Sequence, residues 1–172
     1  MKKKHLLYLF LGLVIVSIGS CNIYDHFRLK YRYQPQAEVA DEFDVFYEKK
    51  LIASDDKGVR KGNEEKLVMY NDDDVAILYI HGFSASRAEG EMVIDSIAKK
   101  YTINTYYLRL PGHGLPPDSM YDMSFKNVLD EANATLDMTH ALGDKVIVVG
   151  TSMGGLIATY LSATRPEMVD GL

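Results

Sequence analysis

"VIVVGTSMGGLIATYLSAT", residues 146–164, predicts a buried strand, a glycine-rich turn and an apolar helix in succession. The turn, Gly150-Thr151-Ser152-Met153-Gly154, fits the pattern Gly-x-Ser-x-Gly. Glycines two positions before and after the serine let strand and helix backbones pass closely, so that the serine hydroxyl can project above a sheet. The pattern therefore predicts Ser152 as a nucleophile. The alternative is a Gly-rich turn that carries a serine by chance.

Two upstream loops support the first interpretation. His81-Gly82-Phe83 directly follows the apolar run 75–80, and Gly82 would let the chain turn so that the Phe83 N–H faces the serine. The Phe83 and Met153 amides would then form an oxyanion hole. We expect His81 to shape its loop by hydrogen bonding rather than to catalyse.

The second of these loops is "RLPGHG", residues 109–114, at the end of another expected strand. Its histidine, His113, is predicted to be structural. His140 is expected to be a boundary residue late on a helix.

The order of elements indicates an α/β fold with a mostly parallel sheet and helices on both faces. Expected strands are 64–70, 75–80, 103–110 and 145–149. Expected helices are 86–100, 124–142 and 153–164, the first opened by a capping box of Ser86 and Glu89, with Val93, Ile94, Ile97 and Ala98 facing inward. Gly143 is expected to stop the second helix.

The ordered set of strand-HGF, strand-PGHG and GTSMGG resembles the α/β-hydrolase superfamily, most closely its monoacylglycerol lipase, carboxylesterase and serine aminopeptidase branch. The resemblance covers about residues 67–172. It implies Ser152 as nucleophile, Phe83 and Met153 as oxyanion amide donors, and Gly150 and Gly154 as elbow glycines. It also implies hydrolysis of a carboxylic ester, such as a lipid or acylglycerol, through an acyl-enzyme. Amides and peptides are alternative substrates of the same machinery.

In this superfamily the triad acid and histidine follow the serine along the chain. Neither has a match in these 172 residues, so we expect an incomplete α/β-hydrolase fold, the N-terminal part of a longer enzyme. The chain alone is predicted to be inactive, because a serine without a base is a poor nucleophile. It is also predicted to fold poorly, with an apolar open sheet edge. The rival hypothesis is a non-catalytic lipoprotein that uses the hydrolase shell to bind a ligand or partner.

The N-terminus resembles a bacterial lipoprotein signal. "MKKK" precedes a fourteen-residue apolar run, Leu6–Gly19, which is short for a membrane span, and Ile18-Gly19-Ser20 precedes Cys21, the chain's single cysteine. The resemblance implies cleavage before Cys21 and lipidation of that residue, so we expect membrane anchoring in the cell envelope. The alternative is a plain signal peptide or an uncleaved anchor that ends in cysteine by chance. Asn22 in place of Asp favours the outer membrane in a Gram-negative host. The expected domains are a signal peptide (1–20), a tether (21–50) and the hydrolase part (51–172).

Charge and composition narrow the classes of ligand. The chain has 24 acidic residues against 19 basic ones, three of which are Lys2, Lys3 and Lys4 in the expected signal peptide. The excess of acidic residues in the rest of the chain argues against nucleic acid as a partner. The sequence offers no Cys/His cluster and no G-x-G-x-x-G after a strand, so no metal and no cofactor is expected.

Overall fold

The computed structural model describes residues 43–70 and 74–172. The expected signal peptide, Cys21 and most of the expected tether lie outside these residues. Four strands form one sheet in the order β1-β3-β2-β4. β2 (Val75–Ile80), β3 (Asn104–Leu108) and β4 (Lys145–Gly150) are parallel, and β1 (Lys66–Val68) pairs antiparallel with β3. The fold class expected from the sequence is confirmed.

The three parallel strands end at the same edge of the sheet. Ile80 of β2 lies opposite Leu108 of β3 on one side and opposite Gly150 of β4 on the other. The loops that follow these strands are the HGF, PGHG and Gly-Thr-Ser-Met-Gly segments, so three stretches far apart in sequence meet at one edge. Beyond β4, Gly171 forms a parallel bridge with Ile147.

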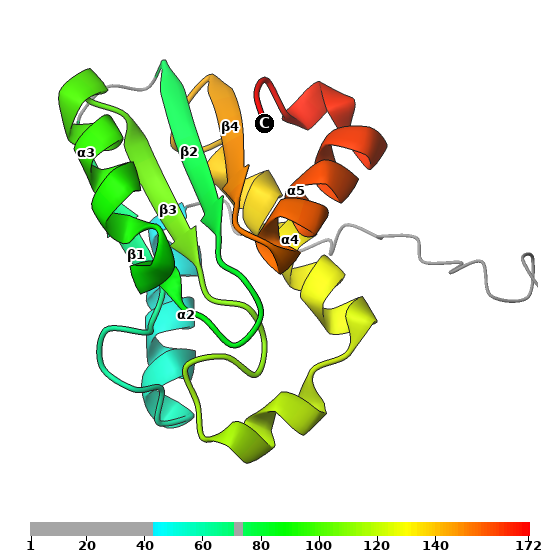
Figure 1. The fold of residues 1–172 in the computed structure, drawn as a ribbon. Helices are drawn as coiled ribbons and strands as arrows, with labels where there is room; N and C mark the ends of the chain where they lie inside the picture. Colours follow the sequence, from blue (N-terminus) through cyan, green and yellow to red (C-terminus); the bar gives the residue numbers. More distant parts are fainter. Residues whose placement is uncertain (1–42, 71–73) are drawn as a thin grey trace, which may run out of the picture. The chain divides into compact units, whose positions relative to one another are not determined.

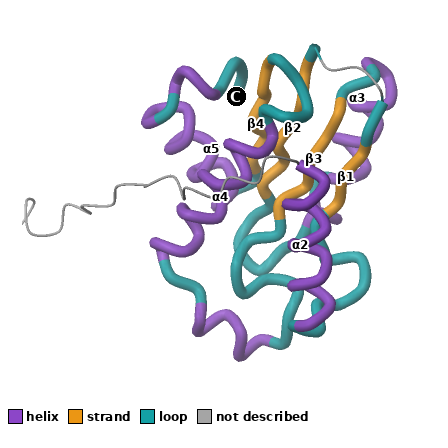
Figure 2. The backbone as a smooth tube through the Cα atoms, turned by 180° about the vertical axis from the view of Figure 1, so that it is seen from behind, coloured by secondary structure: helices purple, strands orange, loops and turns teal. Residues whose placement is uncertain are grey.

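Helices cover both faces of the sheet (Figure 1). α3 (Glu91–Tyr101) packs on one face, where its Ile94 joins Ile77, Tyr79 and Tyr107 in a buried cluster. On the other face lie α2 (Phe43–Asp56), α4 (Phe125–Thr139) and α5 (Met153–Thr164), which Figure 2 shows from behind. β2 and β3 are buried almost throughout because they have neighbours on both faces.

The sequence analysis did not predict α2. The expected boundary between the tether and the hydrolase part, at residue 50, falls inside this helix. Its first turn packs on a β3 side chain: the rings of Phe43 and Tyr47 lie 5.8 and 6.0 Å from that of Tyr106, both edge-on. Among the described residues, no helix is long and apolar enough to span a membrane.

Several element boundaries differ from the expectation. The first strand is only three residues long. The expected start of α4 at Ser124 is confirmed, because Ser124 forms a capping box with Asn127. The helix ends at Thr139, earlier than expected. Gly143 does not stop α4. It lies beside β2 instead, where a Cβ at Gly143 would come within 2.6 Å of the Val75 backbone.

The expected helix 86–100 was wrong at its start. Residues Arg87–Glu89 form a 3₁₀ turn, α3 begins only at Glu91, and the Ser86 side chain caps nothing. Gly90 separates the two because a Cβ there would lie 2.5 Å from the Tyr79 ring. The buried face of α3 also has fewer residues than expected.

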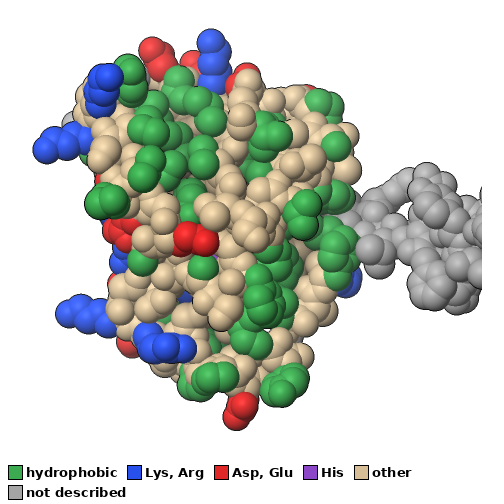
Figure 3. Space-filling model, viewed as in Figure 1, with side chains coloured by type: hydrophobic (Ala, Val, Ile, Leu, Met, Phe, Trp, Pro, Cys, Tyr) green, Lys and Arg blue, Asp and Glu red, His purple; other side chains and the backbone are tan. Residues whose placement is uncertain are grey.

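Of the four apolar α3 residues expected to face inward, only Ile94 and Ala98 are buried. Val93 and Ile97 are exposed, as is Met92, and Figure 3 shows the hydrophobic side chains that gather on this face of the molecule.

Candidate active site

Ser152 lies in a sharp turn between β4 and α5, and it is exposed. We call residues 150–154 the Ser152 turn. The serine has φ 51° and ψ −112°, a conformation that L-residues rarely adopt. Such strain persists only where the surrounding structure holds the residue in place. The backbone therefore has the geometry that the Gly-x-Ser-x-Gly pattern predicts.

Close packing without side chains holds this turn. A Cβ at Gly150 would lie 2.2 Å from the Gly154 carbonyl oxygen, and a Cβ at Gly154 would lie 2.0 Å from the Ile80 carbonyl oxygen. The same Ile80 oxygen accepts a hydrogen bond from the Thr151 N–H at 3.0 Å. The turn is thus pressed against the end of β2, where the next loop begins.

That loop, residues 81–85, we call the His81 loop. Of the backbone amides of residues 82–85, all but one donate a hydrogen bond to an identified acceptor. The Gly82 N–H donates to Glu89 Oε2 at 2.8 Å, the Ser84 N–H to His113 Nε2 at 3.0 Å, and the Ala85 N–H to the Gly82 oxygen at 3.3 Å. Within the described part of the chain, the Phe83 N–H donates no hydrogen bond.

The Met153 amide, in the Ser152 turn, likewise has no hydrogen-bond acceptor among the described residues. Met153 is the first residue of α5, where amides have no partner inside the helix. The next amide, Gly154 N–H, bonds to the Thr151 oxygen at 2.8 Å, whereas the Met153 N–H donates to no residue that the structure describes. A Cβ at Gly82 would lie 3.3 Å from the Thr151 oxygen, so the His81 loop and the Ser152 turn are in contact.

Two buried histidines connect the His81 loop to residues 109–114, which we call the His113 loop. His81 Nε2 accepts the Leu110 N–H at 3.1 Å, and in exchange His113 Nε2 accepts the Ser84 N–H. A neutral imidazole carries one proton, so in both rings that proton is on Nδ1, from which His81 donates to the Gly82 oxygen and His113 to the Pro111 oxygen. The ring centroids are 4.8 Å apart.

Burial keeps both rings neutral. It lowers the pKa of His81 to about 4, and it also lowers the pKa of His113. The loop-shaping role expected for His81 and the structural role expected for His113 agree with these contacts. The third described histidine, His140, follows the last residue of α4, where its Nε2 lies 2.9 Å from the Met168 oxygen. None of the three forms a hydrogen bond with Ser152 in the described structure.

A profile of the family described as "alpha/beta hydrolase fold" matches residues 75–172, more than half of the chain. The chain belongs to this family. Among curated relatives, the chain is similar to a pimeloyl-(acyl-carrier protein) methyl ester esterase of Legionella pneumophila (strain Paris), 32% identical over 96 residues, and to the sn-1-specific diacylglycerol lipase ABHD11 of Danio rerio, 26% identical over 104 residues. These alignments cover 56% and 58% of this chain.

The same alignments cover only 35% and 31% of the two relatives, so the chain spans about a third of the length of the curated relatives it matches. Among solved structures, the fold is similar to one described as "LipS and LipT, two metagenome-derived lipolytic enzymes" (TM-score 0.59, 22% identity, 64% of this chain and 44% of that one). It is also similar to Est1E of Butyrivibrio proteoclasticus with ferulic acid bound (TM-score 0.53, 20% identity, 62% and 45%). These structural likenesses show the α/β-hydrolase fold.

The sequence analysis missed the role of Glu89. We assigned its side chain to a capping box, but it accepts the Gly82 N–H and so anchors the His81 loop from the 3₁₀ turn Arg87–Glu89. Only the three-dimensional path of the chain reveals this bond, because the two residues are seven positions apart and in different elements.

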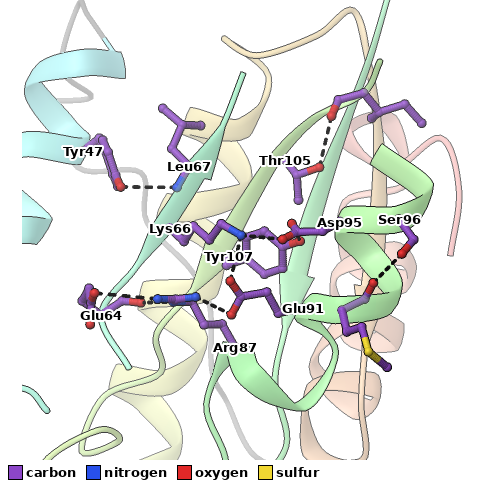
Figure 4. A network of polar contacts seen from close by, with 12 residues as sticks. Tyr47, Glu64, Lys66, Leu67, Arg87, Glu91, Asp95, Ser96, Thr105 and Tyr107 are labelled. Carbon is purple, nitrogen blue, oxygen red and sulfur yellow. Dashed lines mark hydrogen bonds and ion pairs between the residues drawn. The ribbon is translucent and has the colours of Figure 1, made fainter. Parts of the chain in front are cut away.

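An ion-pair network fixes the 3₁₀ turn that carries Glu89 (Figure 4). Arg87 forms an ion pair with Glu91, and its Nε donates to the backbone oxygen of Glu64 at 3.0 Å. Lys66 of β1 lies 2.8 Å from Glu91 and 2.6 Å from Asp95. Burial raises the pKa of Asp95, but hydrogen bonds from Lys66 and Tyr107 outweigh it, so that this pKa falls below its usual value. The network joins β1 to α3.

A charged cavity elsewhere in the molecule shares only the His113 loop with this region. Its volume is about 400 Å³, it lies among α2, α4 and the His113 loop, and Ser152 does not line it. The buried Arg109–Glu65 pair and the Lys50–Glu131 pair border this cavity. In the described ranges, no group of three or more His, Cys, Asp or Glu side chains is arranged to hold a metal ion.

Proposed function

We propose that the complete protein is a serine hydrolase that cleaves carboxylic esters with Ser152 as the nucleophile. The observation that carries this proposal is the strained, exposed Ser152 in a turn that touches the His81 loop. Each of these two segments has one backbone amide, Met153 and Phe83, with no partner among the described residues. Amides at Phe83 and Met153 would donate to the oxygen that becomes negative when Ser152 Oγ attacks an ester carbonyl. The alcohol then leaves, and water hydrolyses the acyl-enzyme to release the acid.

The names of the similar proteins support an ester as the substrate class. One is a methyl ester esterase, another a diacylglycerol lipase, and a third is among lipolytic enzymes. An acylglycerol or another lipid ester is the substrate that we propose. No metal or organic cofactor has a role in this chemistry.

We further propose that the general base and its acid partner come from outside residues 43–70 and 74–172. His81 and His113 each use both ring nitrogens in hydrogen bonds to the backbone, and His140 bonds to the backbone at Met168. By itself, the part of the chain that the structure describes would then be inactive, because Ser152 would lack a base.

A fluorophosphonate probe tests this function against the rival hypothesis of a binding module. We expect the complete protein to be labelled on Ser152 and to hydrolyse p-nitrophenyl butyrate, and the Ser152→Ala variant to lose both properties. A complete, folded protein that is neither labelled nor active would instead support the binding module. Equal hydrolysis by the Ser152→Ala variant would reject Ser152 as the nucleophile.

A separate proposal concerns the N-terminus, which lies outside the described residues. We propose that Cys21 is lipidated and anchors the protein in the cell envelope, on the strength of the Ile18-Gly19-Ser20-Cys21 signal. Cells fed radioactive palmitate should label the protein and retain it in the membrane fraction. The Cys21→Ser variant should lose the label, and a variant labelled like the original would contradict lipidation at this residue.

A further inference from the structure

We propose that the His81–His113 pair is a positioning device that locks the Gly82–Phe83 peptide, so that the Phe83 N–H points toward the acyl oxygen. The proposal rests on the proposed function, because it assigns a task to two residues around the Ser152 site. Neither histidine touches the substrate. Both act through the backbone of the His81 loop.

The geometry of one peptide group carries the argument. The Gly82 carbonyl and the Phe83 N–H belong to the same planar trans peptide, so they point in opposite directions. His81 Nδ1–H donates to the Gly82 oxygen at 2.8 Å, and the Ala85 N–H bonds to that oxygen at 3.3 Å. While these bonds hold the carbonyl, the Phe83 N–H must point away from the buried His81 ring.

The neighbouring peptides are fixed as well, which prevents the central one from rotating. On one side the Gly82 N–H is held by Glu89, and on the other the Ser84 N–H is held by His113 Nε2. Ser84 has φ 59°, in the left-handed region that a serine occupies only when its surroundings hold it there. His113 supplies one of the bonds that hold it.

The two rings must also carry their protons on the correct nitrogens. The Leu110 N–H occupies Nε2 of His81 and thereby leaves the proton on Nδ1, where the Gly82 oxygen needs a donor. The task of His113 is the opposite, because it needs an acceptor at Nε2 for Ser84. Thus His81 acts on the loop as a donor and His113 as an acceptor.

This difference allows a crossed test with amide side chains. Asn places its amide near the Nδ1 position of a histidine, whereas Gln places it near the Nε2 position. We expect His81→Asn and His113→Gln to keep the locking bonds, and His81→Gln and His113→Asn to lose them. In the complete protein, with p-nitrophenyl butyrate, the last two variants should lose roughly 10- to 100-fold in kcat with KM changed by less than about twofold.

The first two variants should stay within about fivefold of the original kcat. The matched control is His140→Gln, because His140 bonds to the Met168 oxygen and to neither loop. Equal losses in the Asn and Gln variants at each position, or the reverse order, would overturn the lock, since a merely structural role has no reason to give the crossed pattern. Ser152→Ala separates the two claims: full activity in that variant rejects the proposed function and the lock with it. Loss of activity in Ser152→Ala together with a nearly unchanged kcat in His81→Gln and His113→Asn rejects the lock alone.

Should these variants not fold, amide hydrogen exchange of the unaltered protein decides the matter. We expect the Ser84 amide to be protected and the Phe83 amide to exchange faster. Exchange of Ser84 as fast as that of Phe83 would show that His113 does not hold the loop.

Discussion

The Ser152 turn and the His81 loop meet at one edge of the sheet, yet different forces hold them. The Ser152 turn depends on missing atoms: Gly150 and Gly154 let backbone approach backbone closer than any Cβ allows. The His81 loop depends on polar side chains: His81, His113 and Glu89 each bond to its backbone. Adding one carbon should therefore break the turn, whereas removing a donor or acceptor should break the loop.

The largest effect should come from Gly154→Ala. The added carbon would lie 2.0 Å from the Ile80 carbonyl, which cannot move away while it accepts the Thr151 N–H. We expect a loss of at least about 3 kcal/mol in the free energy of unfolding, measured by urea denaturation of the complete protein.

Gly155→Ala is the matched control for this substitution. A Cβ at Gly155 would meet nothing closer than the Gly150 oxygen at 3.3 Å, and alanine favours a helix, so the change should stay within about 1 kcal/mol. Similar urea midpoints for the two alanine variants would show that glycine packing does not hold the Ser152 turn.

The next effect separates the two regions by pH. Burial lowers the pKa of His81 to about 4, against about 6.5 in an unfolded chain. The stability that comes from the neutral ring is therefore complete above pH 6.5 and is lost as the pH falls toward 4, because the unfolded chain binds the proton more tightly. Between pH 7.5 and 5 this loss should be about 2 kcal/mol.

His81→Asn carries no titrating group and should lack this part of the pH dependence, whereas Gly155→Ala should keep it. The charged and titrating neighbours of His81 are His113, Glu89 and Arg109, and all of them remain in both proteins. Urea denaturation at both pH values gives the comparison. A pH dependence that is the same with and without His81 would show that its neutral state does not stabilise the loop.

The sequence predicted the turn better than the loop, for a physical reason. The bounds of α5 and the strand before it follow from local features: a continuous apolar run, glycines at fixed spacing and a stop before Pro166. Packing by glycine leaves a mark in the sequence at the positions where it occurs. The conformation of Ser152 could be predicted from that pattern alone.

Bonds between distant elements leave no such mark. Glu89 looked like a capping-box residue because Ser86 stands three positions earlier, but its partner is Gly82. α2 was missed because its apolar and charged residues are poorly separated around the helix. Phe43 and Tyr47 are four positions apart, but only the structure shows that both pack on one β3 ring, that of Tyr106. The exchange of amides between His81 and His113 likewise required the two loops to be placed side by side.

A smaller effect tests the strain at Ser152. Its φ of 51° and ψ of −112° are accessible to glycine without steric cost, so Ser152→Gly should relieve strain that Ser152→Ala retains. We expect the glycine variant to be more stable than the alanine variant by about 1 kcal/mol, after the greater freedom of glycine in the unfolded chain is deducted. Both variants lack the hydroxyl, so a difference between their thermal unfolding temperatures reports the backbone strain and not the loss of the hydroxyl. A less stable glycine variant would mean that the turn holds Ser152 without strain.

The smallest effect concerns Glu89, which holds the His81 loop from the solvent-exposed side. Glu89→Ala removes the acceptor of the Gly82 N–H, and the loss should be about 1 kcal/mol because water can replace an exposed carboxylate in part. Glu89→Gln keeps an acceptor oxygen at the same reach and should lose less than half of that. Hydrogen exchange localises the effect: the Gly82 amide should exchange faster in the alanine variant, while the amides of β4 stay unchanged. Faster exchange throughout the sheet would mean that Glu89 stabilises the whole domain and not the loop.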